Sequence, residues 1–586
     1  MKPSACHTRI ITSLIVAFFT MGTGFRIILA NTPVNVLLIL VDDLGYGDLS
    51  ITGNPYLKTP NIDFLAKHGV SFKNFYVSPV CAPTRASLLT GKYHQRVGVQ
   101  SVTNGYEVLN PEEVTLAELL SSNNYQTAIF GKWHLGEYYP SVPLAQGFDY
   151  FCGFRTGHTD EYFDPQLEVN HKSRKFTGFI TDILTNQAIE FMTARQNDPF
   201  FCYLAYNAPH TPLQVDSSYF LPFIKNGLDE CTARVYGLIR NLDENIGRIL
   251  KVLKEQDLEK ETLVIFMSDN GPISGWKIPQ DEMRFNAGLR DQKFTVYDGG
   301  IRTVCFWYAP GYLPQKEVAK VSAHIDVLPT IVDMLQVEDR DASGRDGHSL
   351  LPAIFGEATE HYFFQKFGLN SLGDSAAFPG GIVRDGDWKM VDGVELYDLG
   401  VDPGEKNNLY LKFPAKAAKL EDAYIDWWSS ILNSYSLEKK PISIGYKVAP
   451  ETLLQPHHAT AFGTLRFEGK RGLTGERLGY HPSGVDGDWV VGWEQKGDRL
   501  TWEVEVVDES SFLFEIIGKN WLLRKKDLQL VIDGARYPIS HSGGEEDSTV
   551  FNPVFLSKGL HHISLEIITD GDSGRSVLEA LLVRRL

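Results

Sequence analysis

The chain has 586 residues, of which 43% are hydrophobic and 22% charged, and its formal net charge at pH 7 is −17. A chain of this length is too long for one hydrophobic core, so we expect two or three domains. The sequence has no cluster of Lys and Arg that could serve nucleic-acid phosphates, which argues against a nucleic-acid partner. Any anionic substrate therefore needs a locally cationic pocket.

The N-terminal segment has the pattern of a secretory signal. Lys2 and Arg9 precede an apolar run at 10–19 that is too short to span a bilayer. This pattern predicts a signal peptide at 1–30, no stable membrane span, and a secreted, periplasmic or cell-surface protein. A retained membrane anchor is the alternative.

The cysteines do not form a disulfide framework. Four of the six, Cys152, Cys202, Cys231 and Cys305, show no paired spacing. Cys202 and Cys305 lie in apolar runs, so we interpret them as core thiols.

Apolar runs that alternate with helical patterns predict one large sheet. The predicted strands are 35–41, 70–77, 126–130, 200–206, 262–267 and 303–309. Helices are expected at 180–195 and over a stretch with Val235, Leu242, Ile249 and Leu253 on one face. This alternation is typical of an α/β fold with a mainly parallel sheet.

Polar clusters follow the first five of these strands. Because the carboxyl ends of parallel strands share one edge, where ligands bind, we expect the clusters to meet there. Asp42 and Asp43 repel each other unless a cation lies between them, and oxygen ligands suit Ca²⁺ or Mg²⁺. Taken alone, the pair could also belong to a solvated turn. The clusters are 42–47, 81–85, 131–136, 207–212 and 268–271.

The cluster at Cys81 carries the most specific pattern. Cys81 is predicted at a helix N-terminus with Arg85 one turn later, a setting that suits a nucleophile or a bound anion. On its own, the cysteine could equally be a small buried hydrophobe. The string Cys-Ala-Pro-Thr-Arg, followed by Leu-Thr-Gly-Lys, resembles the signature of the formylglycine sulfatases, in which this cysteine is oxidised to an aldehyde. The string from Val41 to Asp48 is similar to the usual beginning of these proteins.

The resemblance covers most of residues 34–410. Leu289 to Lys293 and Asp298 to Arg302 resemble the segment Leu-Arg-x-x-Lys…Glu-Gly-Gly-x-Arg, with Asp298 where Glu is commoner. Its role is left open, whereas Lys293 aligns. Segments 384–389 and 396–409 look like the small antiparallel subdomain of the family. The resemblance implies an alkaline-phosphatase-like α/β fold, with a large mostly parallel sheet flanked by helices.

The composition changes near residue 441. Short alternating runs at 500–507, 511–517, 528–532 and 561–568 predict a β-sandwich. We expect a catalytic domain at 31–340, a small α+β subdomain at 341–440 and the sandwich at 441–586. The sandwich is interpreted either as a carbohydrate-binding module or as a packing domain.

The resemblance also implies ligands and roles for the polar residues. One Ca²⁺ would be held by Asp42, Asp43, Asp269, Asn270 and the modified Cys81. The aldehyde at position 81 would be hydrated to a gem-diol, one hydroxyl attacking sulfur and the other later expelling sulfate. The remaining roles are orientation of the diol by Arg85, sulfate binding by Lys132 and Lys293, protonation of the leaving group by His210 with Lys293, and proton acceptance by His134 and Asp269.

The expected substrate is a sulfated carbohydrate. His158, Asp160, Glu161 and Arg174 lie in a long loop-like segment that could form a specificity wall. A formylglycine-generating or anaerobic sulfatase-maturing enzyme would be a partner. Two alternatives are a phosphodiester or phosphonate monoester hydrolase of the same superfamily and a catalytically silent carbohydrate-binding protein.

Overall fold

The computed structural model describes residues 35–194, 198–273, 284–357, 362–368, 375–433, 439–469, 488–519, 528–540, 549–570 and 576–586. The signal predicted at 1–30 lies outside the described residues. Every helix within those ranges is too short or too polar to cross a bilayer.

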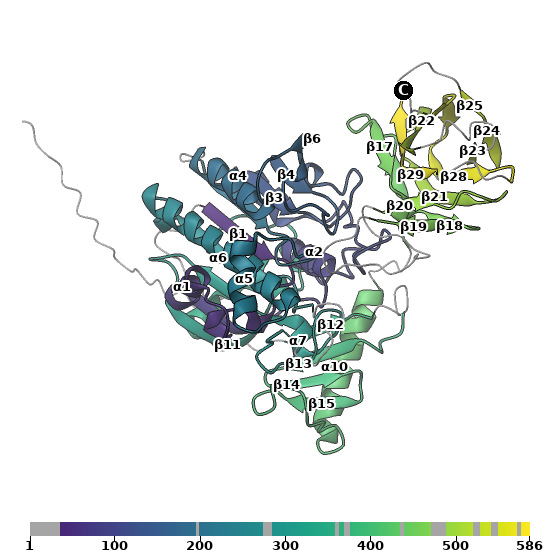
Figure 1. The fold of residues 1–586 in the computed structure, drawn as a ribbon. Coiled ribbons are helices and arrows are strands. Elements are labelled where there is room, and N and C mark those ends of the chain that lie inside the picture. Colours follow the sequence, from purple (N-terminus) through teal and green to yellow (C-terminus); the bar gives the residue numbers. More distant parts are fainter. Residues whose placement is uncertain are drawn as a thin grey trace, which may run out of the picture.

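The largest unit is an 11-stranded sheet whose centre is β1 (Asn35–Val41). β1 pairs in parallel with β8 (Thr262–Ser268) on one side and with β7 (Phe200–Ala205) on the other, and β7 pairs in parallel with β3 (Gln126–Lys132). The strand order is β11-β2-β10-β8-β1-β7-β3-β4-β5-β6 (Figure 1). Further from the centre lie β2 (Val70–Tyr76), β4 (Tyr150–Phe154) and β11 (Lys316–Ala323). The predicted parallel strands are confirmed.

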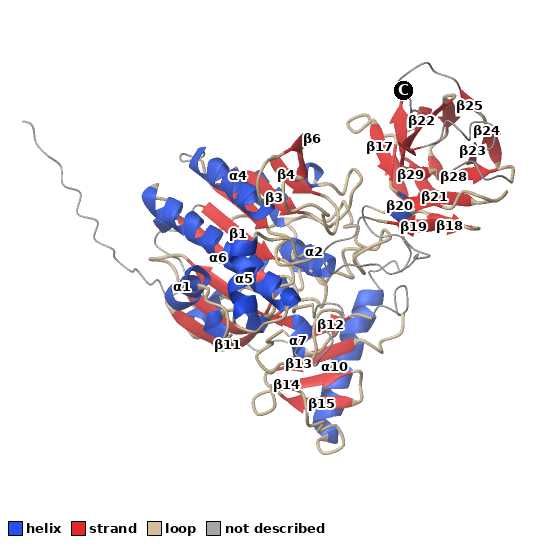
Figure 2. Cartoon of the chain, viewed as in Figure 1, coloured by secondary structure: helices blue, strands red, loops and turns tan. Residues whose placement is uncertain are grey.

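Helices cover both faces of this sheet (Figure 2). Along β1, Val36, Leu38 and Leu40 pack into one core, while Leu37 and Ile39 pack into the other, because successive side chains point to opposite faces. One layer contains α2 (Cys81–Thr90), α3 (Leu116–Ser122), α8 (Val327–Leu335) and α9 (Leu351–Phe355). The other contains α1 (Pro60–His68), α4 (Ile180–Ala194), α5 (Ser217–Lys225) and α6 (Glu230–Glu255), so both predicted helices are confirmed.

Two parts of the sheet differ from the expected pattern. The predicted strand at 303–309 forms β10 (Cys305–Tyr308), which runs antiparallel to its neighbours β8 and β2. The segment expected to be loop-like contains a hairpin of β5 (Gln166–Val169) and β6 (Lys172–Lys175) at the sheet edge. The loop prediction was wrong there because the four residues of β6 are all exposed, which leaves no apolar period to read.

A second, four-stranded antiparallel sheet follows the main one. Its strands are β12 (Phe363–Lys366), β13 (Gly381–Asp385), β14 (Trp388–Val391) and β15 (Glu395–Asp398). Helix α10 (Pro414–Leu432) covers this sheet, with Leu420, Tyr424 and Ile431 buried against it. Figure 1 shows this unit beside the sheet end that carries α7 (Asp298–Ile301).

The C-terminal residues form two stacked sheets around one apolar core. The first sheet contains β16 (Ile442–Ile444), β18 (Thr460–Phe462), β21 (Arg499–Val506), β23 (Leu528–Ile532), β24 (Ala535–Tyr537) and β28 (Gly559–Ile567). The second contains β17 (Glu451–Leu454), β19 (Arg466–Glu468), β20 (Trp489–Val491), β22 (Ser510–Lys519), β25 (Ile539–Ser540), β26 (Thr549–Phe551), β27 (Val554–Leu556) and β29 (Val577–Arg585). Side chains of β21 alternate between core and surface, which confirms the strand pattern.

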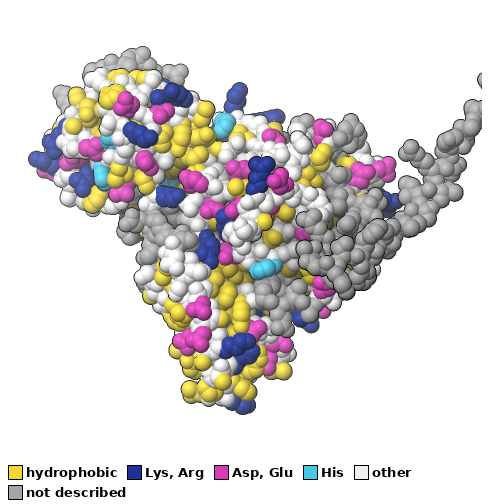
Figure 3. Space-filling model, turned by 180° about the vertical axis from the view of Figure 1, so that it is seen from behind, with side chains coloured by type: hydrophobic (Ala, Val, Ile, Leu, Met, Phe, Trp, Pro, Cys, Tyr) yellow, Lys and Arg dark blue, Asp and Glu magenta, His cyan; other side chains and the backbone are white. Residues whose placement is uncertain are grey.

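The cysteines and the surface charge agree with the predictions from the sequence. Cys152, Cys202 and Cys305 are free and buried, and Cys231 is free and half-buried. On the face shown in Figure 3, Lys and Arg side chains are scattered among Asp and Glu and form no broad basic surface.

Candidate active site

The carboxyl ends of β1 and β8 bring the acidic residues together. Val41 pairs with Ser268 in the ladder, so Asp42 and Asp269 follow side by side. The amide of Asp43 donates to Asp269 Oδ1 at 3.2 Å. Asp43 has φ of 63°, in the left-handed region that costs a non-glycine residue of order 1 kcal/mol. The chain holds this strained turn where three carboxylates converge.

Three oxygens in this turn are buried without a hydrogen-bond partner: Asp42 Oδ1, Asp43 Oδ2 and Asn270 Oδ1. Leaving a buried carboxylate oxygen unsatisfied is costly, so such atoms call for a ligand. Ligand atoms of Asp42, Asp269 and Cys81 lie within 4.8 Å of one another. Asp42, Asp43, Asp269 and Asn270 offer oxygen ligands, which Ca²⁺ and Mg²⁺ prefer. The residues present therefore fit a hard divalent cation.

Lys132 is the last residue of β3, and it reaches across β7 to the acidic turn. Its Nζ lies 2.7 Å from Asp42 Oδ2, and both side chains are buried. Gly131 makes this approach possible. It has φ of 110°, and a Cβ at this position would lie 2.0 Å from the Ala205 carbonyl oxygen. A larger residue would push β3 away from β7.

Lys293 comes from a segment outside the sheet. Its amide donates to the Pro272 carbonyl at 2.9 Å, which fixes the segment against the turn after β8. Its Nζ lies 2.5 Å from Asp43 Oδ1, to which Asn270 Nδ2 also donates at 2.7 Å. Gly271 permits the docking, because a Cβ there would lie 1.9 Å from the Gly299 carbonyl oxygen.

Helix α2 begins at Cys81, after the extended residue Val80. Arg85 lies one turn later and is completely buried. Its Nη2 donates to Asp269 Oδ2 at 2.8 Å and its Nη1 donates to the Lys132 carbonyl at 2.9 Å. Arg85 thus ties the helix that carries Cys81 to both β8 and β3.

His134 contacts the sulfur of Cys81 directly. Its Nδ1 lies 3.3 Å from Cys81 Sγ, and its Nε2 lies 2.8 Å from the Val102 carbonyl oxygen. A carbonyl can only accept, so Nε2 carries a proton and, in the neutral ring, Nδ1 is the basic nitrogen. The lone pair of His134 Nδ1 therefore points at residue 81.

His210 faces the acidic turn from the loop after β7. Its Nδ1 donates to the Thr211 carbonyl at 2.7 Å, and its Nε2 lies 3.7 Å from Asp43 Oδ2. Its side chain is 19% exposed, the most open of the charged groups here. Burial, against the pull of Asp43 and Asp42, lowers the pKa of His210 to about 4.

The electrostatics of the cluster are balanced without a metal. Three carboxylates face three cations, Lys132, Arg85 and Lys293. Burial works to raise the pKa of Asp42, but Lys132 and its other cationic neighbours outweigh it and hold that pKa well below its usual range. Burial and the nearby charge of Asp42 raise the pKa of Asp269 well above its usual range. A divalent cation would leave the site net positive, which suits a sulfate monoanion.

The expected substrate-binding residues fall in two places. His158 Nε2 lies 3.8 Å from Asp160 Oδ1, and Glu161 Oε2 lies 3.8 Å from Lys175 Nζ. This segment adjoins the His210 loop, because the next residue, Tyr162, donates its hydroxyl to the His210 carbonyl at 2.7 Å. Arg174 lies on β6, stacked over Phe176 and next to the Lys175 that Glu161 contacts. That strand is three places from β3, about 14 Å at the usual strand spacing.

The sequence analysis assigned no role to two residues at the site, Arg284 and Asn207. Arg284 donates to the Asp43 carbonyl at 2.9 Å and forms a buried ion pair with Asp48, so it braces the acidic turn. Asn207 is buried, and neither polar atom of its side chain has a hydrogen-bond partner. Its place directly after β7 was the only available signal. No sequence signal pointed to Arg284, because it binds a backbone carbonyl and such a contact leaves no pattern in the sequence.

The role of Asp298, left open by the sequence, is structural. It is buried, accepts a hydrogen bond from the Tyr76 hydroxyl at 2.9 Å, and lies 3.0 Å from Lys389 Nζ. Arg384 lies 3.6 Å away, and Glu405 accepts from the Asp298 amide at 2.8 Å. Asp298 therefore joins the main sheet to the small antiparallel sheet.

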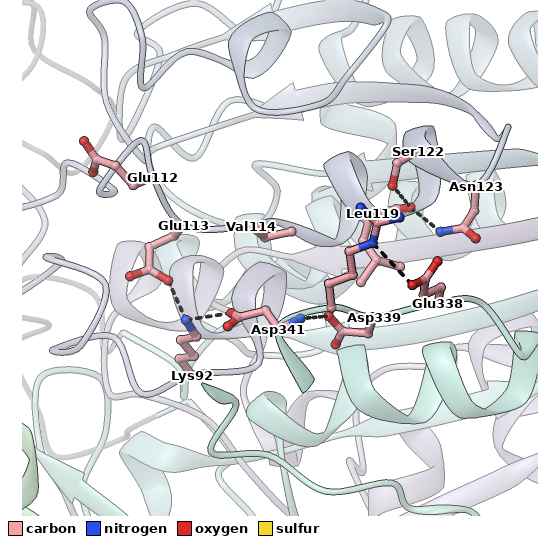
Figure 4. Close-up of a pocket in the computed structure, with 11 residues that line it drawn as sticks. Lys92, Glu112, Glu113, Val114, Leu119, Ser122, Asn123, Glu338, Asp339 and Asp341 are labelled. Carbon is pink, nitrogen blue, oxygen red and sulfur yellow. Dashed lines mark hydrogen bonds and ion pairs between the residues drawn. The ribbon is translucent and has the colours of Figure 1, made fainter. Parts of the chain in front are cut away.

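A separate pocket lies between α3 and residues 338–341 (Figure 4). Lys92 Nζ lies 2.8 Å from both Glu113 and Asp341. The lining is predominantly acidic, with Glu112, Glu338 and Asp339 in addition. Such a surface repels a sulfate ester, so this pocket is not the candidate active site.

Comparisons with known proteins agree with this geometry. The Sulfatase family model matches residues 34–337. N-acetylgalactosamine-6-sulfatase of Sus scrofa is 31% identical over 66% of this chain and 78% of its own, and arylsulfatase A of Homo sapiens is 31% identical over 55% and 68%. The crystal structure of Ps i-CgsB in complex with k-i-k-neocarrahexaose is 29% identical, with a TM-score of 0.60 over 68% of this chain and 93% of that one. The phosphonate monoester hydrolase SpPMH from Silicibacter pomeroyi, 23% identical with a TM-score of 0.51 over 68% and 95%, shares the fold.

The family model spans more than half of the sequence, and the relatives align over most of their own length. Both matches cover the region that carries the acidic turn, Cys81 and the two histidines, and both assign it to one family. This chain belongs to the sulfatase family, whose members are sulfuric ester hydrolases, within the alkaline-phosphatase-like superfamily.

Proposed function

We propose that this protein hydrolyses sulfate esters of a carbohydrate, using a formylglycine made from Cys81 and one Ca²⁺ ion. The observation that carries the proposal is the meeting of three buried oxygens that have no hydrogen-bond partner with two lysines and two histidines, at the strand ends beside Cys81. The Cys81 sulfur marks the position that the reacting oxygen of the hydrated aldehyde would take. Export through the segment at 1–30 and a maturation enzyme are parts of the same proposal, supported by the sequence pattern alone.

The proposed reaction needs two groups besides these side chains, a divalent cation and a hydrated aldehyde at residue 81. When bound, the cation supplies Lewis-acid stabilisation of a sulfuryl oxygen and lowers the pKa of a nearby hydroxyl. Asp42, Asp43, Asp269 and Asn270 would hold it. The hydrated aldehyde supplies a nucleophile with a second hydroxyl, which an ordinary serine lacks.

The lysines neutralise the sulfuryl group. Each Nζ is committed to one carboxylate oxygen, Lys132 to Asp42 and Lys293 to Asp43, and each retains further N–H donors. Donors that are already held in place need no reorganisation as charge moves in the transition state. Lys132 and Lys293 thus bind the sulfate and stabilise its reacting form.

The two histidines handle protons on different sides of residue 81. His134 presents a basic Nδ1 to residue 81 and accepts a proton from it. His210 keeps Nδ1 bonded to Thr211, so its Nε2 is the atom that can protonate a leaving alcohol. The negative charge of a bound sulfate ester favours the protonated form of His210, which offsets the effect of its burial.

A sugar substrate is supported by the relatives. One is named for sulfated N-acetylgalactosamine, and another was solved with k-i-k-neocarrahexaose. In this chain, His158, Asp160 and Glu161 adjoin the His210 loop and would contact the sugar whose sulfate reacts. Arg174 would contact only a substrate that extends to the sheet edge.

The test combines chemistry at residue 81 with kinetics. Mass analysis of the Cys81 peptide from active protein should show the loss expected for exchange of SH₂ for O, together with a carbonyl that reacts with hydrazides. Cys81→Ser should abolish sulfatase turnover, whereas Cys231→Ser, which changes a half-buried thiol on α6, should leave it unchanged. Full activity of Cys81→Ser would contradict the formylglycine mechanism. Faster hydrolysis of the phosphate than of the sulfate ester of the same alcohol would instead identify a phosphoester hydrolase.

A further inference from the structure

A second cluster of ligand-type side chains lies where the β-sandwich meets the main sheet unit. Glu137 follows β3, three residues after His134. The short 3₁₀ helix η8 (Pro456–His458) of the sandwich brings His457 and His458 to it. Glu137 Oε1 lies 2.9 Å from His457 Nε2 and 3.2 Å from His458 Nε2. Neither histidine belongs to the residues matched by the sulfatase family model.

The cluster is buried and contains a second carboxylate. Glu107 Oε1 lies 3.6 Å from His458 Nε2, and the side chains of Glu107, His457 and His458 are at most 3% exposed. The Glu137 side chain is 10% exposed. Lys439 also faces this region, because its Nζ donates to the His458 carbonyl at 2.8 Å. Two carboxylates and two imidazoles are therefore gathered in a largely buried space, with Lys439 beside them.

We propose that Glu137, His457 and His458 bind a Zn²⁺ ion, with Glu107 as the fourth ligand. The ligand atoms of the first three lie within 4.8 Å of one another. Bonds of about 2.0–2.1 Å in a tetrahedral site place neighbouring ligand atoms about 3.3 Å apart. Glu137 Oε1 lies 2.9 and 3.2 Å from the two Nε2 atoms, and Glu107 Oε1 lies 3.6 Å from that of His458. Mixed imidazole and carboxylate ligands suit zinc, whereas Ca²⁺ and Mg²⁺ prefer oxygen alone.

Hydrogen bonds alone give a poorer account of the cluster. Both imidazoles would have to donate to the same oxygen, Glu137 Oε1. A divalent cation instead accepts a lone pair from each neutral ring, so the two imidazoles no longer compete for one acceptor oxygen.

The position of the site gives it a structural purpose. Glu137 belongs to the loop that carries His134, and Glu107 belongs to the segment whose Val102 carbonyl holds His134 Nε2. Tyr138 adds a contact between the same parts, since its hydroxyl accepts from the Gln455 amide at 3.0 Å. Zinc at this point would fasten the sandwich to both segments that position His134.

The full-length protein tests this directly. Metal-free protein, kept in excess Ca²⁺ to occupy the acidic turn, is titrated with Zn²⁺, and the zinc that remains after desalting is counted by mass spectrometry. We expect one zinc per chain, and Co²⁺ in its place should give the visible absorption of a four-coordinate site. Glu137→Gln keeps an oxygen that accepts hydrogen bonds but removes the charge, so it should weaken zinc binding by at least about tenfold.

Matched variants make the result decisive. His457→Ala/His458→Ala should lose the zinc. His561→Ala/His562→Ala should keep it, because these neighbours on β28 point to opposite faces of a strand and cannot share one ion. Wild-type protein that retains no zinc, or retention unchanged in His457→Ala/His458→Ala, would overturn the proposal. If that variant fails to fold, Glu137→Gln decides, and undiminished affinity there would overturn it.

Discussion

His134 Nδ1 lies 3.3 Å from the sulfur of Cys81, while the opposite ring nitrogen is fixed by the carbonyl of Val102. This pair defines which nitrogen is basic and where it points. A backbone carbonyl is an acceptor at every pH, so it holds the ring in one tautomer. His134 is thereby prepared to take a proton from the side chain of residue 81.

Replacing this base should slow the reaction without weakening substrate binding. We expect His134→Ala to lower kcat by about 10²–10⁴, the usual contribution of a positioned acid or base, with little change in KM. Added imidazole should restore part of the rate, because it can enter the vacated space. His171→Ala, which changes a histidine at the hairpin turn, is the control and should keep wild-type kinetics. An equal rise in KM would assign His134 to substrate binding instead.

Metal binding should compete with protons at Asp269. Because the pKa of Asp269 is raised in the metal-free site, part of the population carries a proton there that a cation must displace. Ca²⁺ affinity should therefore fall as pH falls, by up to about tenfold per pH unit where one proton is released. Calorimetry in two buffers of different protonation enthalpy measures that release. Glu113→Gln, at the separate acidic pocket, should leave it unchanged, and a pH-independent affinity would contradict this linkage.

Asp298 should matter for stability more than for chemistry. Removing its charge takes a buried carboxylate away from Arg384 and leaves Lys389 with Glu405 alone. We expect Asp298→Asn to lower the free energy of unfolding by about 3–5 kcal/mol, measured by urea denaturation. Glu255→Gln breaks an exposed pair with Lys251 on α6 and should cost about 0.5 kcal/mol or less. Similar losses in the two variants would mean that the buried network contributes nothing special.

Substrate length should separate His158 from Arg174. His158 lies in the segment bonded to the His210 loop, whereas Arg174 lies on the outer hairpin. His158→Ala should lower kcat/KM for both short and long sulfated oligosaccharides by about tenfold. This is the effect expected when one hydrogen bond to a charged group is lost. Arg174→Ala should affect only the long ones. Neither should change hydrolysis of a generic aryl sulfate, and equal losses on that substrate would show that the substitutions disturb the site itself.

The sequence predicted the parts of the site that follow strands. Asp42, Lys132 and Asp269 come at the ends of apolar runs, and the rule that parallel strands share an edge was enough to bring them together. Arg284 could not be found this way, because it acts on the carbonyl of Asp43, and backbone atoms carry no sequence signal. The hairpin at Arg174 was missed for a related reason, since an exposed polar edge strand has no period to detect.

The difference between aryl and sugar sulfates should reveal the acid. An alcohol leaves with more negative charge than a phenol does, so its departure depends more on a proton from His210 Nε2. We expect His210→Ala to slow hydrolysis of a sugar sulfate by about 10²–10⁴, and that of an aryl sulfate with an acidic phenol by less than about tenfold. A plot of rate against leaving-group pKa should become steeper in the variant. His68→Ala, at the end of α1, is the control. Parallel plots for wild type and His210→Ala would rule out proton donation by His210 and leave Lys293, bonded to Asp43, as the candidate acid.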